Sequence, residues 1–158
     1  MHSNHSDWVT RTELVFPQDA NPLGTMFGGR VLQMMDGNSA IAAFRFCRGA
    51  AVTASSEPID FRTPIRVGDI IEVRSRVAWA GRSSMIIRSE VYSEDPLTGE
   101  RRLCTVGHMN FVAVDADGRP VPVPELLVRD GAEEAHREAG QRVREAILLR
   151  REQVAGGA

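Results

Sequence analysis

The amino-acid sequence predicts an α+β fold in which an antiparallel β-sheet packs on one long helix. Residues 25–48 carry apolar side chains on most sides at helical spacing, which is typical of a buried helix. From Val52 onward the apolar period changes from about 3.6 residues to about 2, as expected for strands. A strand, a long helix and then four strands in this order imply a sheet packed on that helix.

Each element is bounded by recognisable signals. Residues 8–16 alternate in polarity and predict the first strand, and residues 17–24 form a loop. Thr25 is the expected N-cap of the helix, which ends at Arg48-Gly49, a cation followed by a glycine. Four strands are expected at residues 52–61, 69–79, 83–92 and 103–114, separated by turn-forming sequences. One face of the second of these four strands carries Ile71, Val73, Val77 and Trp79.

The last part of the chain differs in character from the rest. Pro120, Pro122 and Pro124 form a connector to a charged helix at about residues 132–153. We therefore expect a main domain at residues 1–124 and a C-terminal helical extension at residues 125–158. The sparse apolar positions of this helix favour a packing helix or a frayed tail, and a role in assembly is the alternative.

Composition excludes several classes of protein. A chain of 158 residues with a net charge of −2 is one domain without the basic field that nucleic-acid binding requires. The longest weakly polar stretch, residues 31–46, contains Asp36 and Arg45, so no segment is expected to span a membrane. The first ten residues do not resemble a signal peptide, and the cytoplasm is the expected location. Cys47 and Cys104 have no metal-binding or redox spacing, so no metal site is expected.

Asp36 is the first candidate catalytic residue. An ionised carboxylate within an apolar helix is costly to bury without partners. The alternative is an Asp on the exposed edge of the helix, or one bonded to a loop. Its helical face is shared with Gly29, Leu32, Ala40 and Ala43, three of which are Gly or Ala, so this face has room for a substrate.

The junction between loop and helix is the second candidate. Amides that are free at a helix N-terminus, here at Gly28 and Gly29, can donate hydrogen bonds to a developing oxyanion. A close contact between helix and sheet that only glycine permits is the alternative explanation. Asn21 could brace the preceding loop, or it could hold a water molecule or a carbonyl oxygen.

Five motifs occur in an order that resembles the acyl-CoA thioester hydrolase branch of the hot-dog superfamily. The first is N-x-x-G-T-x-F-G-G-x-x-x-x-x-x-D, from Asn21 to Asp36. The others are V-T-A-S at residues 52–55, D-F-x-x-P-I-x-V-G-D at 60–69, G-R-S-S-M at 81–85 and F-V-A-V-D at 111–115. The resemblance covers about residues 8–124 and implies an antiparallel sheet wrapped around a long central helix.

The resemblance also implies a reaction and a set of residues. It implies hydrolysis of acyl-CoA thioesters to a carboxylic acid and coenzyme A, without a separate cofactor. Asp36 and Asn21 match the family's catalytic pair, Thr53 lies where the pantetheine chain or the floor of the site is expected, and Arg82, Ser83 and Ser84 lie where coenzyme A binds. Arg62 and Arg66 are comparable candidates for phosphate contacts. The family further implies homodimers with active sites between subunits, assembled as a trimer of dimers.

Helix geometry independently favours a shared site. Asn21 and Asp36 are 15 residues apart, and Asp36 is expected about three turns, or roughly 16 Å, into the helix. A short polar side chain does not reach across that span. The pair meets more easily if Asn21 comes from one subunit and Asp36 from another.

Thioester hydrolysis requires few catalytic groups. A thiolate leaving group, whose conjugate acid has a pKa of about 8.5, needs little help from a general acid. One carboxylate and an oxyanion hole suffice, with Asp36 acting either as general base or as nucleophile.

Two other functions are possible for a protein of this fold. An acyl-thioester dehydratase needs a histidine beside a carboxylate. His2 and His5 lie in the N-terminal arm and His136 in the C-terminal helix, which leaves only His108 among the predicted strands. A non-catalytic acyl-CoA binding or sensing protein would keep the pocket without the carboxylate, so Asp36 argues against it.

Overall fold

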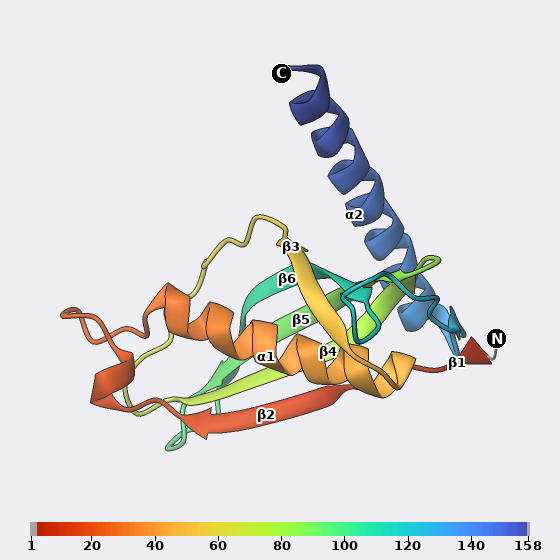
Figure 1. Cartoon of the computed structure of the whole chain (residues 1–158). Helices are drawn as coiled ribbons and strands as arrows, with labels where there is room; N and C mark the ends of the chain where they lie inside the picture. The colour runs from red at the N-terminus through yellow and green to blue at the C-terminus, as the bar shows by residue number, and fades with distance from the viewer. Residues whose placement is uncertain (1–2, 158) are drawn as a thin grey trace.

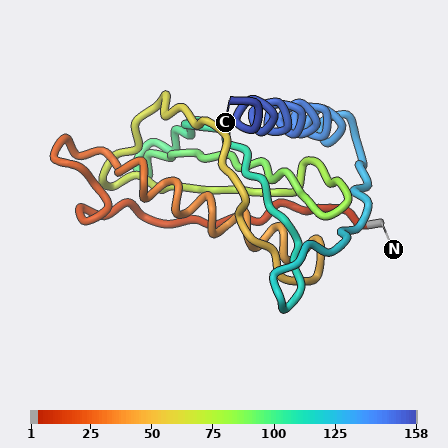
Figure 2. The backbone as a smooth tube through the Cα atoms, turned by 45° about the horizontal axis from the view of Figure 1, so that its top comes forward, coloured from red at the N-terminus to blue at the C-terminus, as the bar shows by residue number. Residues whose placement is uncertain are grey.

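The computed structural model describes residues 3–157 and confirms the α+β prediction. Its centre is a five-stranded antiparallel sheet in the order β2–β4–β5–β6–β3. The strands are β2 (Val9–Leu14), β3 (Ala51–Ser56), β4 (Ile70–Ala80), β5 (Ser84–Glu94) and β6 (Arg101–Ala113). Helix α1 (Gly28–Cys47) lies on one face of the sheet and α2 (Gly131–Gly156) on the other (Figure 1; Figure 2). The sheet curls around α1, which is the hot-dog arrangement.

Three short elements complete the fold. The 3-10 helix η1 (Pro17–Asp19) follows β2. The short strand β1 (Ser3–Asn4) pairs in parallel with β7 (Glu125–Leu126), so residues near the two ends of the domain lie side by side. None of the described helices combines the length and apolar character needed to cross a lipid bilayer.

The hydrophobic core lies between α1 and the sheet. The largest side chains that are fully buried there are Val15, Val31, Met34, Met35, Phe46, Ile71, Val73, Met85, Ile87 and Phe111. A small polar cluster crosses this core. Asn38 Nδ2 of α1 donates to Ser75 Oγ of β4 at 2.9 Å and to the carbonyl of Val9 at 2.8 Å, while Ser89 Oγ of β5 lies 2.7 Å from Ser75 Oγ and 2.8 Å from Ser39 Oγ. These hydrogen bonds fix the position of α1 along the strands.

The outer face of the sheet is covered by α2. Asp130 caps this helix by accepting a hydrogen bond from the amide of Glu133 at 2.8 Å. Glu133 forms an ion pair of 2.8 Å with Arg76 of β4, and both side chains are 7% exposed. Farther along, Gly140 packs on Trp79 and Ile147 is fully buried. The helix is therefore packed on the sheet over most of its length.

Three predicted details differ from the structure. The N-cap of α1 is Phe27 rather than Thr25, because Thr25 is extended, bridges to Arg66 and has its hydroxyl bound by Asn21. Strand β3 ends at Ser56 rather than at residue 61. Pro58, which lacks an amide hydrogen, lies where the chain leaves the edge of β6.

Trp79 lies on the face opposite to the predicted one. A β-bulge between Val77 and Trp79 shifts the register of β4 against β5, which turns the indole away from the core. The ring instead contacts α2 at Gly140, where an added Cβ would lie 2.7 Å from Trp79 Cβ.

Candidate active site

Asp36 lies on the exposed face of α1, and its carboxylate is held by the neighbouring edge strand. Thr53 Oγ1 of β3 donates a hydrogen bond of 2.7 Å to Asp36 Oδ1. Both residues are exposed, so the carboxylate is accessible while one of its oxygens is fixed. The structure therefore brings together two of the residues singled out in the sequence.

The side chain of Asn21 is not hydrogen-bonded to Asp36 in the described chain. It instead forms hydrogen bonds within its own loop. Its Oδ1 accepts hydrogen bonds from the amides of Leu23 at 2.9 Å and Thr25 at 3.2 Å, and its Nδ2 donates to Thr25 Oγ1 at 2.8 Å. Asn21 is only partly buried. The bracing role considered for this residue is present in the structure.

The N-terminus of α1 presents free amides at its first turn. Phe27 caps the helix without a side-chain hydrogen bond, and the first amides of any helix have no partner within it. An added Cβ at Gly28 would lie 3.3 Å from the ring of Phe61, so glycine permits this ring to cover the turn. An added Cβ at Gly29 would meet nothing within 4 Å, so no close contact requires glycine at this position.

Two adjoining cavities lie beside this turn. One, of about 250 Å³, is formed between the first turn of α1, the loop 57–66 and β6. Its apolar lining comes from Met26, Val31, Phe61, Pro64, Ile65 and Cys104. The second, of about 360 Å³, continues along β6 past Asp60 and Arg62, and the two share Thr63, Cys104 and Thr105. Together they offer an apolar end near Gly28 and a polar end open to solvent.

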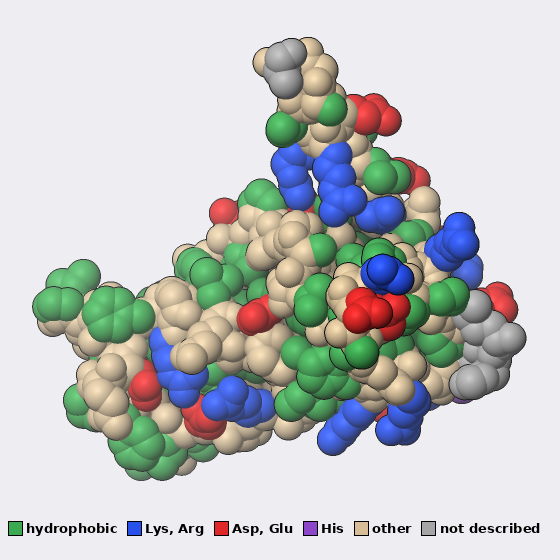
Figure 3. Space-filling model, in the orientation of Figure 1, with side chains coloured by type: hydrophobic (Ala, Val, Ile, Leu, Met, Phe, Trp, Pro, Cys, Tyr) green, Lys and Arg blue, Asp and Glu red, His purple; other side chains and the backbone are tan. Residues whose placement is uncertain are grey.

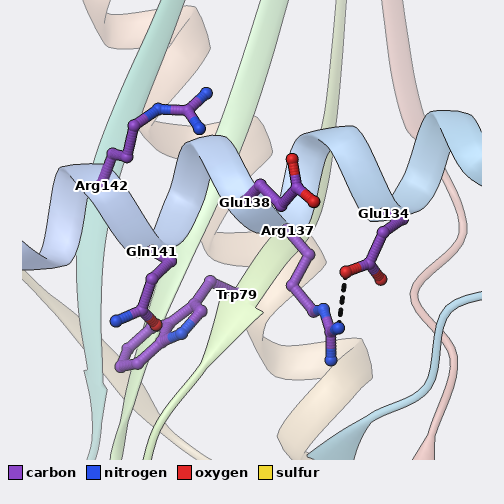
Figure 4. A pocket seen from close by; sticks show the side chains of 6 residues that line it. All are labelled: Trp79, Glu134, Arg137, Glu138, Gln141 and Arg142. Carbon is purple, nitrogen blue, oxygen red and sulfur yellow. Dashed lines mark hydrogen bonds and ion pairs between the residues drawn. The ribbon is translucent and has the colours of Figure 1, made fainter.

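A third cavity, of about 400 Å³, lies on the other side of the molecule between α2 and the end of β4. Figure 4 shows Trp79 below the helix, with Arg137 turned toward Glu134 at 2.6 Å. This cavity is separated from Asp36 by the sheet, so it is not part of the same site.

The residues predicted to bind coenzyme A lie at the opposite end of the sheet from Gly28. Arg82 and Ser83 lie in the hairpin between β4 and β5, and Ser84 begins β5. Ser84 pairs with Val112, which on its other side pairs with Val52 near the start of β3. The loop beside Gly28, in contrast, follows the end of β3. Arg82 is exposed, whereas the side chain of Ser84 is buried beside Gly81.

The exposed side of α1 and β3 carries three large hydrophobic side chains. Hydrophobic side chains appear at the surface over α1 (Figure 3). Ile41 and Phe44 of α1 and Val52 of β3 are 41%, 42% and 51% exposed. β3 is also an edge strand, because β6 is its only neighbour in the sheet as described. An apolar face beside a free strand edge is typical of a subunit interface.

His108 does not share a site with Asp36. It alternates with Gly107 and Met109, which face the core, and so it lies on the outer face of the sheet. Burial, with Arg88 nearby, lowers the pKa of His108 to about 4. The histidine–carboxylate pair that a dehydratase needs is therefore not formed by these two residues. Among residues 3–157 there is also no cluster of three or more potential metal ligands.

Sequence reasoning missed the loop 57–66. Phe61 was part of a matched motif, but nothing in the pattern showed that its ring covers Gly28. Glu57 and Arg150, which form an ion pair, are 93 residues apart, and no local pattern connects them.

The fold and the site define a class, and residues 23–100 match the model of the Thioesterase superfamily. The chain is 42% identical over 119 residues to the uncharacterized acyl-CoA thioester hydrolase YkhA of Bacillus subtilis, covering 75% of this chain and 69% of the relative. It is 35% identical over 122 residues to the acyl-CoA thioester hydrolase YciA of Escherichia coli, covering 75% and 91%. The chain belongs to the acyl-CoA thioester hydrolase family.

Solved structures agree with this assignment. An apo-hexameric acyl-CoA thioesterase superimposes with a TM-score of 0.91 at 37% identity, covering 95% of this chain and 97% of that one. The acyl-CoA hydrolase of Staphylococcus aureus, in complex with butyryl coenzyme A, coenzyme A and coenzyme A disulfide, gives a TM-score of 0.85 at 34% identity, covering 94% and 93%. Structures of the S. aureus enzyme include alanine variants of an asparagine, an aspartate and a threonine, separated by 15 and 17 positions.

Proposed function

We propose that this protein hydrolyses acyl-CoA thioesters to a free carboxylic acid and coenzyme A, with Asp36 as the catalytic carboxylate. The observation that carries the proposal is the exposed Asp36 carboxylate, fixed by Thr53 at 2.7 Å. Asn21, Asp36 and Thr53 are separated by 15 and 17 positions, the same spacings as the three residues varied in the S. aureus enzyme. Three residue types at two matching spacings support the assignment of all three to one site.

Asp36 acts either as general base on water or as nucleophile. The hydrogen bond from Thr53 occupies one carboxylate oxygen and leaves the other available for a water molecule or for the thioester carbon. Free amides at Gly28 and Gly29 would stabilise the oxyanion that develops on the carbonyl oxygen. Because coenzyme A leaves as a thiolate, no further acid is required, and the reaction consumes only water.

The two halves of the site belong to different subunits. Since α1 begins at Gly28, Asp36 lies eight residues along it, about 12 Å from the free amides. One carbonyl group does not contact both ends of that span within one chain. If the free edge of β3 pairs with β3 of a second copy, Asp36 of each subunit can approach the α1 N-terminus and Asn21 of the other. The exposed Ile41, Phe44 and Val52 would be buried by this pairing.

The same pairing accounts for the position of Arg82. In one chain Arg82 lies at the end of the sheet where β3 begins, and Gly28 lies where β3 finishes. An antiparallel two-fold arrangement of β3 places the hairpin of one subunit beside the cavities of the other. Arg82 and Ser83 would then contact the coenzyme A moiety while the acyl group lies by Gly28. We expect the dimers to assemble as a trimer of dimers, as hexameric relatives support, and the protein to act in the cytoplasm.

The test is release of free coenzyme A thiol from a panel of acyl-CoAs of different chain length. We expect the wild type to hydrolyse at least one acyl-CoA. Asp36→Ala should lower the rate about 10²- to 10⁴-fold, because the substitution removes the catalytic carboxylate. The fold should be unchanged, because Asp36 is exposed. Glu138→Ala, an exposed carboxylate on α2, is the matched control. A wild type that binds acyl-CoA and releases no thiol would be a binding protein instead, and equal rates in Asp36→Ala would remove that residue from the mechanism.

A mixture of two inactive variants tests the shared site. Asn21→Ala and Asp36→Ala proteins, unfolded together and refolded, form mixed dimers in which one site has both native residues and the other has neither. Random mixing should therefore restore about a quarter of the wild-type activity. A mixture as inactive as its components would place both residues in the same subunit's site.

A further inference from the structure

The loop 57–66 forms the outer wall of the cavities beside Gly28. Phe61 lies against the first turn of α1, and Pro64 and Ile65 line the apolar cavity. Pro58, Asp60 and Arg62 line the cavity that continues toward solvent. The position of this loop therefore sets the shape of both cavities.

The loop is held at both ends and at two points between them. At its start, the amide of Glu57 donates to the carbonyl of His108 at 3.0 Å, and at its end the carbonyl of Ile65 accepts from the amide of Met26 at 2.7 Å. Between them, Thr105 Oγ1 donates to the carbonyl of Asp60 at 2.7 Å. Ile59 also packs at Gly107, where an added Cβ would lie 2.9 Å from its Cδ1.

The side chain of Glu57 points away from the cavities and toward α2. Both of its carboxylate oxygens accept hydrogen bonds from Arg150 of that helix, at 2.9 and 3.0 Å. Glu57 is 13% exposed and Arg150 is 45% exposed. A bidentate pair of this kind restricts orientation as well as distance, because two parallel hydrogen bonds fix the plane of the carboxylate.

The other contacts of α2 are independent of this ion pair. The helix is held near its start by the buried pair of Glu133 with Arg76, and farther along by Gly140 and Ile147. Removing the guanidinium of Arg150 therefore leaves the helix packed on the sheet. Arg150 is placed to act on the loop rather than to hold the helix.

We propose that α2 positions the loop 57–66 through the ion pair of Arg150 with Glu57, and so sets the fit of the substrate cavities. The proposal rests on the proposed function of the neighbouring site, and it makes Glu57 and Arg150 positioning residues without contact to the substrate. When the pair is broken, the first residues of the loop gain freedom and the wall at Pro58 to Phe61 shifts. Binding of acyl-CoA weakens, while the chemical step at Asp36 is unaffected.

The experiment uses the full chain with Glu57→Gln, Arg150→Gln and the reversed pair Glu57→Arg with Arg150→Glu. Arg137→Gln is the matched control, because Arg137 pairs with Glu134 within α2. Two quantities are measured, KM and kcat for an acyl-CoA that the wild type hydrolyses, and deuterium exchange of the backbone amides of residues 57–66.

Each single substitution should raise KM about two- to fivefold with kcat nearly unchanged, and should accelerate exchange in the loop. The reversed pair should recover part of both changes, and Arg137→Gln should change neither. Unchanged KM and unchanged loop exchange in both single variants would overturn the proposal, as would an equal effect of Arg137→Gln.

The two proposals fail in different ways. Exchange is measured without substrate, so coupling between α2 and the loop is detected even if the wild type releases no thiol from any acyl-CoA. Conversely, a wild type that hydrolyses acyl-CoA, with loop exchange that is independent of Arg150, would keep the proposed function and reject the role of α2.

Discussion

The two faces of the sheet are covered by helices in very different ways. Beneath α1 the contacts are mostly apolar, and the side chains of Asn38, Ser75 and Ser89 are joined by hydrogen bonds. Among the described residues, Asn38 Oδ1 is the one atom of these three side chains without a hydrogen-bond partner. Beneath α2 the layer contains the Arg76–Glu133 ion pair and two histidines. Arg76 Nε, His108 Nε2 and His136 Nδ1 are buried there without a hydrogen-bond partner among the described residues.

Because of this difference, α1 is attached to the sheet more rigidly than α2. Well-packed apolar side chains give the helix that carries Asp36 one position on the sheet. A layer of charges and incompletely bonded polar groups contributes less to stability and responds to pH and salt. The helix that carries Asp36 is thus the fixed one, and the helix that contacts the loop 57–66 is the adjustable one.

The largest expected effect comes from truncating a side chain beneath α1. Phe46→Ala should lower the free energy of unfolding by about 3–5 kcal/mol, because Phe46 is 2% exposed and the core has no means to fill the void. Ile147→Ala, beneath α2, should cost about 2 kcal/mol and release mainly that helix. Urea unfolding gives both values, and exchange of the α2 amides locates the second effect. Equal costs with one global transition would contradict the difference between the faces.

Acid should loosen the α2 layer selectively. His108 has a pKa of about 4 in the folded protein instead of 6.5, chiefly through burial and then through Arg88 and His136, with Glu57 opposing. Between pH 6.5 and 4 the unfolded chain binds a proton that the folded chain does not. The free energy of unfolding therefore falls as the pH is lowered, by up to about 3 kcal/mol.

The pKa of His136 is also lowered, by burial and by Arg88 and Arg76, with Glu90 opposing, so it acts in the same direction. The measurement is the pH dependence of stability in wild type and His108→Gln, because titrating carboxylates contribute equally to both. Parallel curves from pH 7.5 to 4 would show that His108 does not contribute.

A smaller effect is expected from the polar cluster beneath α1. Asn38→Ala should cost about 1–3 kcal/mol, since it removes the buried amide that donates to Ser75 Oγ and to the carbonyl of Val9. Ser39→Ala, which removes only the contact with Ser89, should cost less. Thermal unfolding orders the two variants, and a larger cost for Ser39→Ala would mean that Asn38 does not anchor the helix.

The sequence was sufficient for the fold because each long element has one dominant period. The apolar positions of α1, β4, β5 and β6 repeat over many residues, so an error of a few residues does not change the result. The family motifs then specified the curled sheet around the helix, and the structure confirms it. The prediction was wrong at Trp79, because a single bulge reverses all subsequent facing in a strand and leaves no compositional sign.

The motifs name the residues of the candidate site, but their arrangement could not be predicted from the sequence. The resemblance named both Asp36 and Thr53, but the hydrogen bond between them was not predicted. The hydrogen bond between Asn21 and Thr25 could not be predicted, because it depends on the path of a loop. Two other contacts, Phe61 with Gly28 and Glu57 with Arg150, join segments that are far apart in sequence. The periodicity of the sequence does not predict which distant segments meet. The meeting of Asn21 with Asp36 across subunits stays a prediction.

The free edge of β3 has a consequence for the newly made chain. An isolated copy exposes the outer edge of β3, which has no strand partner among the described residues, together with Val52, Ile41 and Phe44 at the surface. Such an edge is a template for indiscriminate strand addition and aggregation. Self-association would then protect the protein from aggregation, as well as complete the proposed active site. Its solubility should improve as assembly becomes more complete, and variants that cannot pair should be lost to aggregates or proteolysis.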